Sequence, residues 1–323
     1  MARARSIVAA ALVGLAVGTL ASARAEPYPA RPVRVIVPFA PGGGADMVGR
    51  LVAKRLGDTF GKPFVVENKP GAGGMLGIEA GVKSPPDGHT LVMVTSSYAV
   101  NPSLYRLNFD PIADITPVVQ ISQGPLLIVA HPSLPARSVG ELIALAKRNP
   151  GVVSYASSGP GTITHVCTEL FSAMAGIKML HVPYKGTGPA LTDTIGGQTD
   201  IYFGNTASTL PHVRSGRLRM LAVTTLRRSS ALADVPTVDE SGLPGYEVMH
   251  WYGLIGPKGM PAPVVGRLNA EIARALQLPE TAEHLAADGV VPAGGTPEAF
   301  LERIRKDVAV WRNVVADAGL KVE

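Results

Sequence analysis

The feature of this sequence that most constrains its fold is a repeated alternation of short strand patterns with helical patterns. Strands are expected at 33–37, 64–67, 90–95, 126–130, 152–155, 179–182, 201–203 and 218–223. Helices are expected at 45–56, 138–147, 264–276, 279–287 and 297–318, and helical segments lie between most of the other strands. This alternation predicts an α/β fold with mainly parallel sheets.

Length and composition limit the classes of protein that remain. The chain has 323 residues, a length that favours about two domains. Hydrophobic residues make up 46% and charged residues 17% of the chain, which excludes disorder over most of its length. The formal net charge is +5, but no cluster of Lys and Arg is longer than a dipeptide. A nucleic-acid partner is therefore not expected.

Residues 1–25 have the pattern of a secretory signal peptide. Arg3 and Arg5 precede the apolar stretch Ile7–Ala21, and Ala23-Arg24-Ala25 is a small-residue cleavage site. A membrane anchor is the alternative, but the apolar run is short for a bilayer span. Cleavage after Ala25 would leave 27 basic and 25 acidic residues, so the mature chain would have a net charge of only +2.

The bacterial periplasm is the expected compartment for this exported chain. Its one cysteine, Cys167, cannot form an internal disulfide, and no cysteine lies near the cleavage site to carry a lipid. A mature chain of about 298 residues buries enough apolar surface to fold without disulfides. Cys167 is expected to be a small buried residue.

Two stretches share the order strand, small-residue loop, helix. The first is Val33–Asp46, whose loop contains Gly42-Gly43-Gly44, and the second is Val152–His165, whose loop contains Gly159-Pro160-Gly161. Such a loop exposes backbone N–H groups, and the start of the helix adds partial positive charge, so each stretch can bind an anion. Two such sites facing each other across a cleft would hold one small anion. The alternative is that both are ordinary strand-to-helix turns.

The familiar catalytic and cofactor motifs are absent from the sequence. It contains no G-x-x-x-x-G-K-[ST], G-x-S-x-G or H-E-x-x-H pattern, and Gly71–Gly77 lacks the third glycine of a dinucleotide fingerprint. The seven histidines are scattered along the chain. No metal ion, cofactor or catalytic residue is therefore expected.

His165 opens the second of the two predicted helices and is a candidate for ligand contact. Its spacing from Cys167 directs the two side chains apart, so a thiol–imidazole pair is not expected. Its spacing of four residues from Glu169 predicts a hydrogen bond on the helix surface.

Several longer motifs occur in an order that matches a known family. They are Tyr28–Arg34, Val37–Asp46, Val66–Gly74, Asp87–Leu91, Ser157–Thr162, His181–Gly186 and Asp234–Val238. With these motifs the chain resembles the Bug-type extracytoplasmic solute receptors, which are the substrate-binding components of tripartite tricarboxylate transporters. The resemblance covers nearly the whole mature chain.

The resemblance implies a periplasmic binding-protein fold, in which two α/β lobes close over a ligand in the cleft between them. Residues 26–122 would form the first part of lobe 1, 123–248 would form lobe 2, and 249–323 would return to lobe 1. The crossing segments would lie near Val119–Leu127 and Glu247–Leu254. The implied partners are a small carboxylate ligand and the membrane subunits of a tripartite tricarboxylate transporter, and a monomer is expected.

In the family, the two strand–loop–helix segments hold the ligand carboxylate, partly through waters. Carried over by position, the candidate ligand-binding residues are Phe39, Ala40, Gly43, Asp46, Ser96, Ser97, Ser158, Gly161, Thr162, His165, Lys185, Gly186, Tyr202 and Asn205. Asp46 is expected to cap its helix or to hydrogen-bond its loop, because a second negative group would repel the ligand.

Two positions depart from the family pattern. Ala45 stands where a hydroxyl residue is common, and Gly204 stands where an aspartate is common. An acid at position 204 would suit a ligand ammonium group. Gly204 therefore favours a dicarboxylate or an aromatic acid over an amino acid.

Three functions remain open from the sequence. The favoured one is a non-enzymatic receptor that delivers a carboxylate to a membrane transporter, and a receptor that signals through a sensor protein is indistinguishable from it. The alternative is an exported enzyme acting on a small carboxylic acid. Its only acid–base candidates would be His165, Asp46 and Lys185, with no visible third group to orient them.

Overall fold

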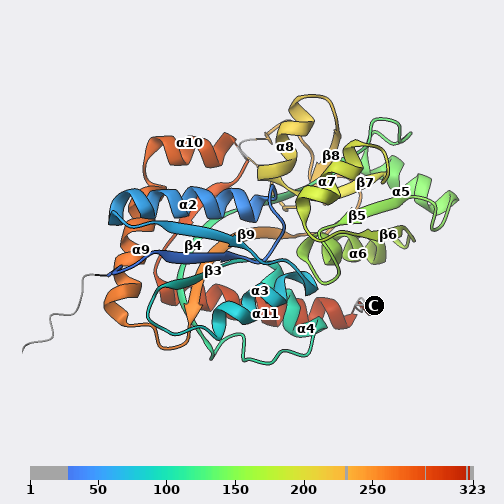
Figure 1. The fold of residues 1–323 in the computed structure, drawn as a ribbon. Coiled ribbons are helices and arrows are strands. Elements are labelled where there is room, and N and C mark those ends of the chain that lie inside the picture. Colours follow the sequence, from blue (N-terminus) through green and yellow to red (C-terminus); the bar gives the residue numbers. More distant parts are fainter. Residues whose placement is uncertain (1–27, 230–231, 288, 318, 321–323) are drawn as a thin grey trace, which may run out of the picture.

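The structure is a computed structural model that describes residues 28–229, 232–287, 289–317 and 319–320 (Figure 1). The predicted signal peptide lies outside the described residues. The strands are β1 (Val33–Val37), β2 (Phe64–Asn68), β3 (Thr90–Thr95), β4 (Ile115–Ala130), β5 (Ser154–Ser157), β6 (Leu180–Pro183), β7 (Ile201–Asn205), β8 (Arg219–Val223), β9 (Met249–Pro257) and β10 (Val291–Gly294). The helices are α2 (Gly44–Phe60), α3 (Met75–Val82), α4 (Ser97–Leu104), α5 (Val139–Arg148), α6 (Ile163–Ala175), α7 (Thr187–Ile195), α8 (Thr206–Arg214), α9 (Ala262–Leu276), α10 (Pro279–Ala287) and α11 (Pro297–Asp317), with a 3-10 turn at Ala72–Gly74. The predicted α/β class is confirmed.

The first half of the sheet is built around β1. This strand pairs in parallel with β2 on one side and with β3 on the other. β3 pairs antiparallel with β9, and β9 pairs antiparallel with residues 115–125 of β4. β10 adds a further antiparallel pair to the same part of β4. We call these strands the first half-sheet.

The second half of the sheet begins where β4 changes partners. Residues 126–130 of β4 pair antiparallel with β7 and β8, and β5 joins β7 to β6 through parallel pairs. We call these strands the second half-sheet. Because β4 is antiparallel to each of its partners, the prediction of mainly parallel sheets is wrong at the centre of the molecule and right only toward the outside.

Thr224 ties together the segments that cross between the half-sheets. Its Oγ1 accepts a hydrogen bond from the N–H of Leu126 at 2.8 Å and donates to the carbonyl of Val248 at 2.7 Å. The backbone of Thr224 adds bonds to the same two residues, at 3.1 and 2.8 Å. These bonds add to the pairing of β4 with β9 and link the crossing segments where the two half-sheets meet.

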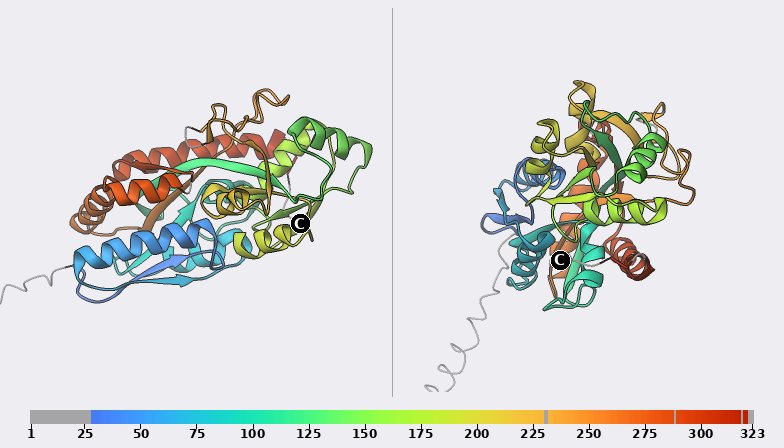
Figure 2. Two further views of the ribbon diagram at one scale, coloured as in Figure 1. Left: turned by 90° about the horizontal axis from the view of Figure 1, so that it is seen from above. Right: turned by 90° about the vertical axis from the view of Figure 1, so that its right-hand side faces the viewer.

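Helices cover both faces of the sheet (Figure 2). β3 shows how the two cores divide, because its side chains alternate between faces. Leu91 and Met93 belong to the apolar cluster that includes α2 and α9, whereas Val92 and Val94 belong to the cluster that includes α4 and α11. The cluster that includes α4 and α11 continues into the second half-sheet, where it contains Phe203 on β7 and Tyr155 on β5. Within the described residues, no helix is both long and apolar enough to cross a bilayer.

Most of the predicted elements overlap the observed ones, and the main differences concern β4 and β9. The sequence predicts only the last five residues of the 16-residue β4, and it assigns most of β9 to a crossing segment. Most residues of both strands are buried. Strands covered on both faces lack the alternation of apolar and polar residues that marks a half-exposed strand.

Candidate functional site

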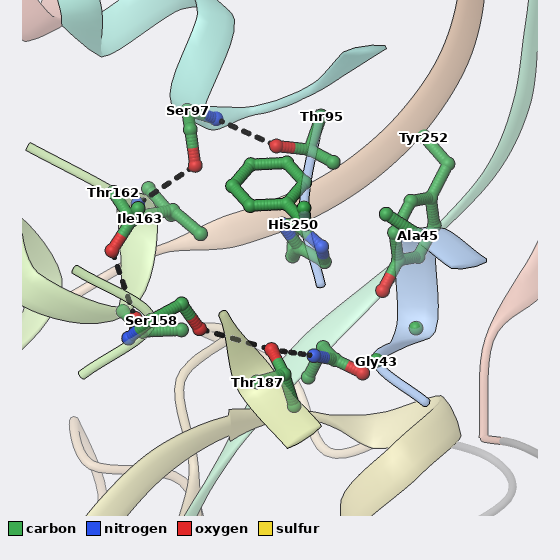
Figure 3. Close-up of a pocket in the computed structure, with 14 residues that line it drawn as sticks. Gly43, Ala45, Thr95, Ser97, Ser158, Thr162, Ile163, Thr187, His250 and Tyr252 are labelled. Carbon is green, nitrogen blue, oxygen red and sulfur yellow. Dashed lines mark hydrogen bonds between the residues drawn. The ribbon is translucent and has the colours of Figure 1, made fainter. Parts of the chain in front are cut away.

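A small cavity lies between the first and second half-sheets (Figure 3). Its volume is about 30 Å³, which is room for no more than a few water molecules. The lining residues come from both half-sheets and from the helices that follow their strands. They are Phe39, Gly43, Gly44, Ala45, Thr95, Ser97, Ser158, Thr162, Ile163, Thr164, Thr187, Asn205, His250 and Tyr252.

Five helices begin at this cavity. The first residues of α2, α4, α6 and α7 line it, namely Gly44, Ser97, Ile163 and Thr187, and so does Asn205, the N-cap of α8. The first turn of a helix has N–H groups without partners inside the helix and carries partial positive charge. The lining, which consists of described residues, contains no Lys, Arg, Asp or Glu. The cavity therefore suits an anion held by N–H and hydroxyl groups rather than by a cationic side chain.

Side chains on the second half-sheet connect these groups into a network. The Oγ1 of Thr187 lies 2.9 Å from the Oγ of Ser158 and accepts hydrogen bonds from the Nδ2 of Asn205 at 3.0 Å and from the hydroxyl of Tyr202 at 3.1 Å. Burial raises the pKa of Tyr202 to about 12, so its hydroxyl stays neutral and can donate. The network fixes the hydroxyls that face the cavity.

Contacts between the two half-sheets close the cavity. The Oγ of Ser97 accepts a hydrogen bond from the N–H of Ile163 at 2.9 Å (Figure 3). The hydroxyl of Tyr105 donates to the carbonyl of Pro160 at 2.6 Å. Each contact joins a residue that follows β3 to a residue that follows β5. These contacts hold the two half-sheets together, and we call this the closed arrangement.

His250 and Tyr252 line the cavity from β9. The Nδ1 of His250 lies 2.6 Å from the Oγ of Ser96, and its ring meets the ring of Tyr252 edge-on, with centroids 4.6 Å apart. Burial lowers the pKa of His250 to about 3. The imidazole is therefore neutral and adds no positive charge to the cavity.

The structure brings only part of the predicted site together. Of the candidate residues, those that line the cavity are Phe39, Gly43, Ser97, Ser158, Thr162 and Asn205. Those that lie outside its lining are Ala40, Asp46, Ser96, Gly161, His165, Lys185, Gly186 and Tyr202. Ser96 and Tyr202 lie directly behind lining residues, since they contact His250 and Ser158. None of the three acid–base candidates of the enzyme hypothesis lines the cavity.

Asp46 is engaged in its own loop, as expected. Its carboxylate accepts hydrogen bonds from the N–H of Gly42 at 3.1 Å, from Arg50 at 3.0 Å and from Asn68 at 2.9 Å. Burial alone would raise the pKa of Asp46, but the bonds from Arg50, Asn68 and Gly42 outweigh it and hold the pKa below its ordinary value. The charge of Asp46 is thus used to shape the Gly42–Gly44 loop.

The backbone N–H of Gly161 is also used inside its own loop. It donates to the Nδ1 of His165 at 3.2 Å, so it does not point to the cavity. The predicted surface bond between His165 and Glu169 is wrong, because His165 is only 6% exposed and Glu169 accepts a hydrogen bond from Tyr155 instead. Cys167 is fully buried, as predicted.

A second, larger cavity lies beside the first one, and we call it the side cavity. Its volume is about 350 Å³, and it shares Phe39 and Ser158 with the small cavity. Its other lining residues are Gly71, Ala72, Gly73, Gly74, Tyr105, Gly159, Pro160, Tyr184 and Lys185. Lys185, the cation expected near the ligand, is therefore placed at the side cavity.

Several residues that line the small cavity are not among the candidates predicted from the sequence. Gly44, Ile163 and Thr164 adjoin named candidates, and Thr187 directly follows the family motif that ends at Gly186. Proximity in the chain was thus an available signal for these four, and also for Thr95, which directly precedes the candidate Ser96. His250 and Tyr252 lie on β9, where no local pattern distinguishes them from core residues.

Solved structures of other proteins resemble this one closely. The periplasmic binding protein BugD is 35% identical, with a TM-score of 0.88 over 92% of this chain and 100% of that chain. Rpa4515 of R. palustris with adipate is 35% identical, with a TM-score of 0.88 over 91% and 99% of the two chains. MatC of Rhodopseudomonas palustris with bound malate is 31% identical, with a TM-score of 0.84 over 89% and 100%. The fold is thus that of the periplasmic binding proteins of the Bug type.

A family model covers most of the chain as well. Residues 48–320 match the model described as the tripartite tricarboxylate transporter family receptor. The match includes α4, α6, α7 and α8 and most of α2, which are the five helices that begin at the cavity. The family and the fold are those of solute-binding receptors. The chain therefore belongs to the receptors of the tripartite tricarboxylate transporter family.

Proposed function

We propose that this chain is a periplasmic receptor that binds a small dicarboxylate at the closed cavity and delivers it to a tripartite tricarboxylate transporter. The observation that carries the proposal is the convergence of five helix N-termini on one cavity whose lining has no charged side chain. N–H and hydroxyl donors stabilise an ionised carboxylate more than a neutral acid, because hydrogen bonds to a charged acceptor are stronger.

The ligands of two structural neighbours support a dicarboxylate. Rpa4515 is in complex with adipate, and MatC is in complex with malate. Both proteins share more than 30% of their residues with this chain and superpose on it over about nine-tenths of its length. Adipate and malate each have two carboxylates. A ligand of this kind could place one carboxylate at the helix N-termini and the second one outside the small cavity.

The side cavity offers space for the second carboxylate. Because Phe39 and Ser158 line both cavities, a small separation of the half-sheets would join the two spaces. Lys185 lines the side cavity, is exposed, and forms no ion pair with the described residues. An ammonium group at this place would pair with a carboxylate that extends out of the small cavity.

An amino acid is the less suitable ligand. The described lining of both cavities contains no Asp or Glu to pair with an ammonium group, and Asp46 is occupied by Arg50 and Asn68. At Gly204, a Cβ would lie 2.1 Å from the Oγ1 of Thr209, so this site has no space for the aspartate that is common in the family. An unpaired ammonium group in a closed cavity would cost several kcal/mol, on the order of the desolvation penalty of an ion.

The proposal includes the remaining expectations from the sequence. Residues 1–25 act as the export signal, 26–122 and 249–323 form one lobe, and 123–248 form the other. The protein acts as a monomer without catalytic activity. Binding closes the lobes, and the closed form is the one presented to the membrane subunits.

Isothermal titration calorimetry tests the proposal on the chain without residues 1–25. The ligands are adipate, malate, succinate and benzoate, together with aspartate and glutamate. We expect the dicarboxylates to bind and the amino acids to bind at least about tenfold more weakly. A protein that binds none of the carboxylates but binds another class of solute would refute the proposed ligand class.

Variants of Lys185 test where the second carboxylate lies. We expect Lys185→Ala to weaken binding of a dicarboxylate by about tenfold and to leave a monocarboxylate of similar length nearly unchanged. Lys147→Ala, at an exposed lysine of α5, is the matched control and should change neither affinity. Equal losses for both classes of ligand in Lys185→Ala would place the lysine away from the second carboxylate.

A further inference from the structure

Three aromatic rings lie nearly parallel behind the loop 157–162, which carries Ser158 to the cavity. The imidazoles of His165 on α6 and His181 on β6 have centroids 4.3 Å apart and planes inclined by 17°. The ring of Tyr155 on β5 lies 4.8 Å from His181, with an angle of 12°. Tyr155 is fully buried and His165 nearly so. Polar rings at such a place require hydrogen-bond partners to be stable.

Both imidazoles form hydrogen bonds with the loop. The Nδ1 of His165 accepts the hydrogen bond from the N–H of Gly161 at 3.2 Å. The Nε2 of His181 lies 2.6 Å from the Oγ of Ser157, and that oxygen accepts the N–H of Gly159 at 3.1 Å. Gly159 and Gly161 have φ angles of +122° and +72°. This is the left-handed region, which favours glycine, and backbone N–H groups in such a turn need specific acceptors.

The hydrogen bonds bear on the tautomers of both rings. Since the Nδ1 of the neutral His165 accepts from Gly161, its proton is on Nε2. The Oγ of Ser157 accepts from Gly159, and its own proton can be donated to the Nε2 of His181. In that arrangement the proton of His181 is on Nδ1, and the stacked rings carry their protons on opposite nitrogens.

We propose that His165 and His181 are positioning residues for ligand binding, which as neutral imidazoles of opposite tautomer fix the loop 157–162 and thereby hold Ser158 and the start of α6 at the cavity. Neither ring lines the cavity, so both act through the loop. This inference rests on the proposed function of the cavity. It goes beyond that function by assigning the geometry of one half of the site to two stacked imidazoles.

The surroundings keep both rings neutral. The pKa of each ring is lowered to about 4, mainly by burial, and for His165 the neighbouring His181 contributes to this lowering. The carboxylate of Glu169, on the same helix as His165, accepts a hydrogen bond from the hydroxyl of Tyr155. The thiol of Cys167, on the same helix, is fully buried, and its pKa is raised by that burial, so it also stays neutral.

Nitrogen NMR on histidine-labelled protein tests the tautomers without any ligand. At pH 7, long-range proton–nitrogen spectra should show His165 protonated on Nε2 and His181 protonated on Nδ1, with assignments from the single variants. A His165 protonated on Nδ1, or both rings in the same tautomer, would overturn the inference. This measurement decides the role of the rings even if the ligand of the receptor is not a dicarboxylate.

Variants that keep or remove the hydrogen-bond acceptor of each ring test the effect on binding, with adipate as the probe. The Oδ1 of Asn can replace the Nδ1 of His165, and the Oε1 of Gln can replace the Nε2 of His181, whereas Leu removes either acceptor. We expect His165→Leu and His181→Leu to weaken binding by about fivefold to tenfold, and His165→Asn and His181→Gln to restore most of it. Circular dichroism and the thermal midpoint confirm that each variant is folded.

The outcomes separate this inference from the proposed function. Loss of affinity in the Leu variants without recovery in the matched amides would show that the rings only fill space, and unchanged affinity in the Leu variants would show that the loop does not need them. If the unmodified protein does not bind adipate or malate, the proposed ligand class fails. The tautomers and the hydrogen exchange of the Gly161 N–H then decide the role of the rings. The protection of this N–H from exchange should be lost in His165→Leu and kept in His165→Asn.

Discussion

The hydroxyl oxygen of Ser97, the first residue of α4, accepts a hydrogen bond of 2.9 Å from the N–H of Ile163, the first residue of α6. The two helices belong to opposite sides of the cavity, so this bond joins the half-sheets at the place where we propose that a carboxylate binds. The bond is thus both part of the closed arrangement and a marker of the proposed anion site.

Replacing Ser97 by alanine should weaken ligand binding by about fivefold. The change leaves the N–H of Ile163 without its acceptor in the closed form, a loss of about 1 kcal/mol. Calorimetry with adipate measures the effect. Ser103→Ala on the same helix is the control, because the Ser103 hydroxyl has no hydrogen-bond partner among the described residues. Equal affinities of the two variants would contradict a role for Ser97 in the closed form.

Ligand binding should reduce the radius of gyration. The closed cavity of about 30 Å³ is too small to admit a dicarboxylate, so the free protein must also populate a wider, open form that the ligand can enter. Bound ligand then shifts the population from the open to the closed form. Small-angle X-ray scattering with and without saturating adipate measures the change. An identical radius under both conditions would show either a rigid protein or one that is already closed, and the predicted crossing segments would lose their support.

Valine at Gly43 or Gly161 should strongly reduce affinity, by tenfold or more. At Gly43, whose φ of −89° suits any residue, a Cβ would lie 3.1 Å from the Cβ of Thr187 and would hold the half-sheets apart. At Gly161, φ is +72° and a Cβ would lie 2.5 Å from the ring of Tyr105. Gly266→Val, at an exposed glycine of α9 with open space around it, is the control. If both loop variants keep full affinity, the loops are only turns.

A dicarboxylate should bind at least about tenfold tighter than its α-amino analogue, a difference of roughly 1.4 kcal/mol. The reason is that the described lining of the two cavities has no acidic side chain for an ammonium group. Paired titrations of succinate against aspartate and of glutarate against glutamate measure this difference. Tight binding of the amino acids alone would mean that carbonyl groups or another acid take the ammonium group.

The stability of the protein should fall below neutral pH in part because of His250. Burial lowers the pKa of His250 to about 3, whereas the unfolded chain has a value near 6.5, so the unfolded state binds more protons between these values. The stabilising contribution is therefore present above about pH 6.5 and is lost as the pH falls toward 3. His165 and His181 act with the same sign.

Urea unfolding at pH 7 and pH 5 measures this effect. His250 alone should account for about 2 kcal/mol of the loss in unfolding free energy at pH 5. In His250→Gln, whatever its stability at pH 7, the difference between the two pH values should be smaller by about that amount. An unchanged difference would show that His250 is charged in the folded protein.

The sequence by itself was enough to determine the α/β class, most of the strands and helices, and the two strand–loop–helix segments. These follow from local signals, such as the apolar runs and the N-caps Ser138 and Thr296, whose side chains accept hydrogen bonds from the N–H groups of Glu141 and Ala299. The resemblance to a receptor family placed six of its candidate residues at the cavity, because they lie within or beside these segments or in short motifs after strands.

Only the tertiary structure decided which side chains complete the site. β4 pairs with β9 across more than 120 residues of sequence, and no local pattern encodes that register. The pairing is what brings His250 and Tyr252 to the cavity. Packing likewise turned His165 inward onto His181 and away from Glu169, because burial of an imidazole depends on neighbours from another strand. Local sequence determines the helices and strands, whereas non-local strand pairing and burial determine which side chains meet at the cavity.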